Sequence, residues 1–132
     1  MINDGAKATL KRLVGTSDLA SAYGNDAGEQ YPEVMSTPAM LALMERACAE
    51  IMRSELKDGQ LSVGVNTQLT HSAPTPIGVE VSASATFKSV DGNLYVFEVV
   101  ANDPKGPVGR GTHARAIVDR TAIEKRAASR RE

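Results

Sequence analysis

Three side chains of complementary chemistry are spaced along this chain: Thr37, Glu45 and His71. A hydroxyl, a carboxylate and an imidazole that converge can activate water or attack a thioester. Each residue also has a purely structural interpretation: Thr37 as a helix cap, Glu45 as a boundary residue that turns to solvent, and His71 as a satisfied core histidine. Only their convergence would favour catalysis, so the elements that carry them decide the question.

Thr37 and Glu45 lie on one predicted amphipathic helix of about twenty residues. Pro38 suits the first helical position, and either Ser36 or Thr37 can cap the free amides. Gly59, after Asp58, ends the helix because glycine tolerates a left-handed backbone. The apolar residues that recur at helical spacing are Met40, Leu41, Met44, Ala47, Cys48, Ile51, Met52 and Leu56.

Glu45 lies at the edge of the apolar arc of this helix, where a carboxylate loses hydration and is suited to act as base or nucleophile. Thr37 precedes it by a rise of about 12 Å. Helical side chains lean toward the N-terminus, so Glu45 reaches back toward Thr37. The helix start also offers free N–H groups to a carbonyl oxygen that gains negative charge.

After Gly59 the hydrophobic period changes to two, which is typical of strands. Strands are predicted over 8–14, 63–71, 77–87, 94–101 and 109–119, with a hairpin turn at Asp91-Gly92. A single apolar-faced helix must bury that face against the sheet. The order of elements therefore predicts an α+β fold of the hotdog type, in which a curled antiparallel sheet wraps one long central helix.

His71 keeps the alternation of Val63, Val65, Thr67 and Leu69, so we expect it to face the helix. It also stands at the end of its strand, because two prolines follow shortly after. The other histidine, His113, is interpreted as a structural residue of the last strand.

The chain has 132 residues, which fits one domain, with 1–7 and 121–132 as terminal extensions. A net charge of −1, three Tyr, two Phe and no Trp argue against a nucleic-acid partner. No stretch approaches the roughly 20 apolar residues of a membrane span, and no signal peptide opens the chain, so we expect a cytoplasmic location and no membrane partner.

The remaining candidates for chemistry favour structural roles. Cys48 is the only cysteine and lies among apolar residues, as a buried thiol does. The basic segment 124–132 is interpreted as a solvated, frayed terminus. No Cys/His spacing indicates a metal site, and no phosphate loop or nucleophile elbow is present.

In several segments, the sequence resembles the fluoroacetyl-CoA-thioesterase-like family of hotdog proteins. The matching segments are STPAM at 36–40, ME at 44–45, GVNT at 64–67, LTH at 69–71 and GRGTHAR at 109–115. That family carries a Thr, a Glu eight residues later and a His twenty-six after that, and Thr37, Glu45 and His71 reproduce both spacings. The resemblance covers roughly residues 8 to 120.

The resemblance implies a homodimer, possibly a tetramer, with active sites at the subunit interface, CoA as leaving group and neither metal nor cofactor. Glu45 would be the nucleophile or the base for water, His71 would assist proton transfer, and Thr37 would position Glu45 or the carbonyl. Gly64 would let the backbone approach the thioester oxygen, and Arg115 would contact the pocket or CoA.

The expected function is therefore acyl-CoA thioester hydrolysis. A domain this small with one helix leaves little room for a long acyl tunnel, so we expect a short or compact acyl group. A loop around Tyr31 and Pro32 stands where a pocket lid would lie. The alternative is a non-catalytic hotdog module that binds or senses acyl-CoA, which would not need Glu45 and His71 together.

Overall fold

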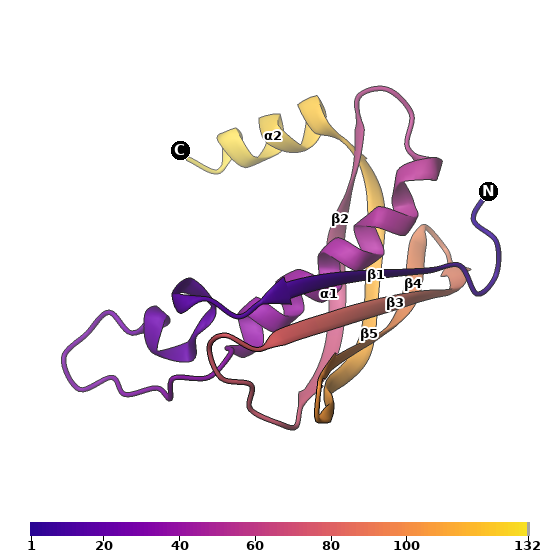
Figure 1. Cartoon of the computed structure of the whole chain (residues 1–132). Helices are drawn as coiled ribbons and strands as arrows, with labels where there is room; N and C mark the ends of the chain where they lie inside the picture. Colours follow the sequence, from indigo (N-terminus) through magenta and orange to yellow (C-terminus); the bar gives the residue numbers. More distant parts are fainter. Residues whose placement is uncertain (132) are drawn as a thin grey trace.

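The computed structural model describes residues 1–131, in which one helix lies across a five-stranded antiparallel sheet (Figure 1). The strands are β1 (Lys7–Leu13), β2 (Gln60–His71), β3 (Glu80–Asp91), β4 (Leu94–Asp103) and β5 (Gly106–Asp119). Their order in the sheet is β1-β3-β4-β5-β2, so β1 and β2 form its edges. The predicted hotdog architecture is confirmed.

The central helix α1 (Thr37–Met52) begins behind Ser36, whose Oγ accepts a hydrogen bond from the Ala39 N–H. A 3₁₀ turn over Arg53–Glu55 follows, so the α-helix is shorter than predicted. Tightening of the last turn is common where helix carbonyls lose their partners. Gly59, with φ +83°, then turns the chain into β2.

The core lies between the helix and the inner face of the sheet. Apolar side chains from α1 pack against alternate residues of β3 and β4, which is the reason for the two sequence periods. The largest of these fully buried side chains are Met40, Leu43, Met44, Met52, Val81 and Phe97. Their burial fixes the position of the helix relative to the strands, and therefore also the position of the polar side chains that helix and strands carry.

The first half of β2 differs from the prediction. The pairing with β5 shifts between Gly64 and Asn66, which leaves Val65 in a β-bulge and 55% exposed. One extra residue reverses which neighbours face the helix on either side of it. Uninterrupted alternation predicted that Val63 and Thr67 share a face of the sheet, and the bulge places them on opposite faces. The residues from Thr67 onward lie as expected.

The basic segment is exposed over 124–131, as predicted, but the prediction that it is frayed is wrong for most of that segment. Helix α2 (Arg120–Ser129) follows β5 directly and projects away from the sheet (Figure 1). Asp119 caps it, because its Oδ2 accepts a hydrogen bond from the Ala122 N–H. The end of the predicted segment, Glu132, lies outside the described residues. Within residues 1–131, no helix is long and apolar enough to cross a membrane.

Candidate active site

The first residue of α1 meets the last residue of β2. Thr37 Oγ1 lies 2.8 Å from His71 Nδ1, within hydrogen-bond distance. Because Ser36 caps the helix, the Thr37 hydroxyl is free to make this contact. The structure thus brings together two of the three predicted residues, and His71 faces the helix as expected.

Two open hollows border this pair. One, of about 290 Å³, is lined by Ala20, Tyr23, Tyr31, Ser36, Thr37 and Pro38. The other, of about 250 Å³, is lined by Val34, His71, Ser72, Ala73 and Pro74. Tyr31 belongs to the loop in which a lid was predicted, and its hydroxyl donates to Glu29 over 2.8 Å. A small group can therefore reach the Thr37–His71 contact from outside.

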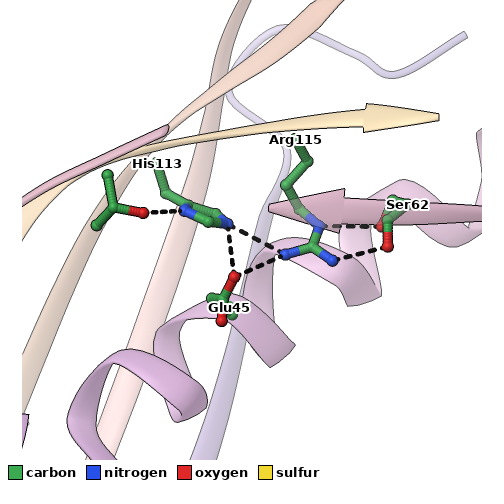
Figure 2. A network of polar contacts seen from close by, with 5 residues as sticks. Glu45, Ser62, His113 and Arg115 are labelled. Atoms are coloured by element: carbon green, nitrogen blue, oxygen red, sulfur yellow. Dashed lines mark hydrogen bonds and ion pairs between the residues drawn. The ribbon is translucent and has the colours of Figure 1, made fainter. Parts of the chain in front are cut away.

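Glu45 lies in a second polar cluster, two turns along the helix (Figure 2). Its Oε2 is 3.4 Å from Arg115 Nη1 and 3.5 Å from His113 Nε2. In the described part of the chain, no hydrogen bond or ion pair joins Glu45 to Thr37 or to His71. A single copy therefore presents the three predicted residues as a pair and a separate carboxylate.

Gly64 makes room for this carboxylate. It lies on β2 opposite Arg115, and a Cβ atom at this position would overlap Glu45 Oε2 and come within 2.9 Å of His113 Cε1. A methyl group cannot be accommodated there without moving Glu45 or the imidazole ring. The structure thus shows a steric reason for glycine at this position. This reason is separate from the implied role of Gly64 in letting the backbone approach the thioester oxygen.

Arg115 is buried, and its guanidinium is held at three nitrogens. Nε donates to Ser62 Oγ and Nη2 donates to the Ser62 carbonyl, each over 2.9 Å, while Nη1 faces Glu45 and His113. Figure 2 shows the guanidinium between the Ser62 backbone and the Glu45 carboxylate. In one copy of the chain, the Arg115 guanidinium thus contacts Ser62, Glu45 and His113.

His113 is the residue of this cluster that sequence reasoning missed as a candidate. Its side chain is only 1% exposed, and Nδ1 lies 2.7 Å from Thr67 Oγ1. Burial lowers the pKa of His113, and the Arg115 charge lowers it further, against the opposing effect of Glu45. The spacing in the sequence could have indicated this residue, because His113 and Arg115 are two positions apart on one strand and their side chains therefore point to the same face.

Other chemistry is limited in this molecule. Cys48 is a buried free thiol, as predicted, and burial raises its pKa to about 12, which leaves it protonated. Within residues 1–131, no group of three or more His, Cys, Asp or Glu side chains could hold a metal ion. The two polar clusters along α1 are therefore the candidate site.

A known protein family matches most of this chain. A model of the fluoroacetyl-CoA-specific thioesterase family matches residues 14–121. A fluoroacetyl-CoA thioesterase from Streptantibioticus cattleyicolor is 39% identical over 89 residues, which is 67% of this chain. The aligned part spans 64% of the length of that relative.

Solved structures show the same fold along nearly the whole chain. The fluoroacetyl-CoA thioesterase FlK superposes with a TM-score of 0.92 at 30% identity, covering 98% of this chain and 97% of that one. A hot-dog-like protein from Thermanaerovibrio acidaminovorans gives 0.82 at 32% identity, covering 96% and 91%. By its fold and by the family match over 14–121, this chain belongs to the fluoroacetyl-CoA-specific thioesterase family.

Proposed function

We propose that this protein is an acyl-CoA thioesterase that hydrolyses a short or compact acyl-CoA to the free acid and CoA. The observation that carries the proposal is the Thr37–His71 contact beside an open hollow, with the Glu45 carboxylate on the same helix. The relatives support the substrate class, since one solved structure of FlK is described as a complex with fluoroacetate and CoA.

In this proposal, Glu45 acts either as the nucleophile or as the general base for water. It either attacks the carbonyl carbon itself, with later hydrolysis of the acyl-enzyme, or takes a proton from a water molecule that attacks. His71 delivers a proton to the departing CoA sulfur, and Thr37 orients His71 through their hydrogen bond. Both routes give the same acid and the same thiol.

The size of the hollow beside Thr37 favours a compact acyl group. Its volume of about 290 Å³ lies just below the range typical of small-molecule pockets, roughly 300–1,000 Å³. Tyr23 and Tyr31 provide part of its wall. An apolar wall next to a reactive pair can bind an acyl chain while leaving the carbonyl at Thr37.

We further propose that two copies assemble, as the resemblance implies, with the site completed at their interface. Strand β2 is a sheet edge, and exposed Val65 lies on it close to Gly64. An unpaired edge is a template for a second chain, and antiparallel pairing of two β2 strands would satisfy its free N–H and C=O groups. Light scattering should report about twice the 14.0 kDa mass of one chain, and a stable monomer at micromolar concentration would contradict this.

The function is tested by thiol release from a panel of acyl-CoAs that runs from acetyl to palmitoyl. We expect the highest kcat/KM among the short or compact members. Tight binding of acyl-CoA by the wild-type protein without any thiol release would favour the non-catalytic binding module. Far higher kcat/KM for long chains would refute the compact pocket.

A further inference from the structure

The partners of His113 determine which of its nitrogens carries the proton. A guanidinium has only donors, so Arg115 Nη1, 3.1 Å away, requires His113 Nε2 to accept. A neutral imidazole then carries its single proton on Nδ1, which donates to Thr67 Oγ1 over 2.7 Å. The ring is thus held at both nitrogens.

Arg115 is equally constrained, because Ser62 occupies Nε and Nη2. Its remaining nitrogen, Nη1, has two N–H groups and two acceptors within reach: His113 Nε2 and Glu45 Oε2, the latter at 3.4 Å. Nη1 therefore joins the imidazole to the carboxylate. In the described part of the chain, Glu45 Oε1 has no such partner and is free to face a reacting molecule.

The two acceptors repel each other without this bridge. His113 Nε2 and Glu45 Oε2 lie 3.5 Å apart, and both accept from Arg115 Nη1 in this arrangement. If Nε2 were lost as an acceptor, both N–H groups of Nη1 would be available to Glu45. The carboxylate would then be drawn toward Arg115 and away from the position that it now holds above Gly64.

We propose that His113 is a positioning residue for Glu45, because its unprotonated Nε2 occupies one N–H of Arg115 and leaves a single N–H for the carboxylate. The inference rests on the proposed catalytic role of Glu45 and goes beyond it. His113 does not touch substrate in this scheme. It sets the direction of a carboxylate that does.

Two variants of one residue separate positioning from packing. In His113→Gln, the side-chain carbonyl reaches about as far as Nε2 and can accept from Arg115, but the bond to Thr67 is lost. In His113→Asn, the shorter amide can keep the bond to Thr67 and loses the acceptor for Arg115. Both variants remove a ring and one hydrogen bond, so their thermal midpoints should fall by similar amounts.

We expect His113→Asn to lower kcat by on the order of 10–100-fold with KM nearly unchanged, since small misplacements of a reacting group have costs of this size. His113→Gln should keep most of the wild-type kcat. Wild-type kcat in His113→Asn, or equal losses in both variants in step with their midpoints, would overturn the inference. Glu45→Gln in the same assay tests the proposed function separately: if it keeps wild-type kcat, the role of Glu45 itself is wrong.

A second measurement needs no variant of His113. Nitrogen-15 NMR distinguishes the two neutral tautomers of histidine, and the chain has only two histidines, so a His71→Ala sample identifies the His113 signals. At pH 7.5 we expect a protonated Nδ1 and an unprotonated Nε2. A proton on Nε2 would point directly at Glu45, exclude the Arg115 bridge and overturn the inference.

Discussion

The two polar clusters along α1 are built in opposite ways. The Thr37–His71 contact is a single hydrogen bond at the helix start, with an exposed hydroxyl and an open hollow on either side. The cluster of Glu45, His113 and Arg115 lies between helix and sheet and is linked by a chain of donors and acceptors. Within residues 1–131, no buried side-chain N or O atom lacks a partner.

The difference indicates how the site divides its tasks. An exposed hydrogen bond adds little to stability and leaves its groups accessible to a ligand. A buried polar network is costly unless every member is satisfied, and once satisfied it holds its members in a single arrangement. We therefore expect the accessible pair to handle the substrate, and the buried His113 and Arg115 to fix the partly exposed carboxylate of Glu45.

The largest expected effect is that of Glu45→Gln on turnover. A positioned base or nucleophile contributes on the order of 10²–10⁴-fold, so kcat should fall by that factor in a thiol-release assay. The exchange is nearly isosteric, and the thermal midpoint should stay close to that of the wild type. Glu50→Gln is the matched control, because Glu50 lies on the same helix, forms an ion pair with Arg53 at the surface and should keep full activity.

A contrast in stability is expected next. Arg115→Met removes the shared donor of the cluster and leaves buried His113 Nε2 without a partner, while the Glu45 side chain, which is 39% exposed, can turn to water, so the free energy of unfolding should fall by about 2 kcal/mol. Thr37→Ala removes one exposed hydrogen bond, and Ser36 still caps the helix, so its loss should be below about 1 kcal/mol. Urea unfolding at equal protein concentration measures both. Equal losses would show that the two clusters do not differ in the way described.

The smallest expected effect concerns pH. The folded protein holds His113 with a lowered pKa, so the unfolded chain takes up a proton first as pH falls below 6.5, the ordinary value. The stabilisation from the neutral ring is complete above pH 6.5 and is lost as pH falls toward the folded pKa, by less than about 1.4 kcal/mol for each pH unit. The unfolding free energy of the wild type should therefore drop more between pH 7.5 and 5.5 than that of His113→Gln. Parallel curves would show that His113 is not buried as a neutral ring.

Local patterns in the sequence determined most of the elements. The helical spacing from Met40 onward predicted α1, and the Asp91-Gly92 turn predicted the hairpin between β3 and β4. The same patterns placed Thr37 at a helix start and His71 at the end of a strand, facing the helix, but the contact between them came from the fold. The early end of α1 and the formation of α2 were missed, since helix ends depend on a few capping contacts.

Only the tertiary structure decided which residues surround Glu45. Arg115 is 70 positions away along the chain, and His113 meets Thr67 across 46 positions, so no local spacing relates them. The bulge at Val65 then sets which residues of β2 face the helix, and it places Gly64 under the carboxylate. Register between distant strands is fixed by how side chains pack when the sheet closes on the helix, and a single added residue reverses the face of every neighbour on one side.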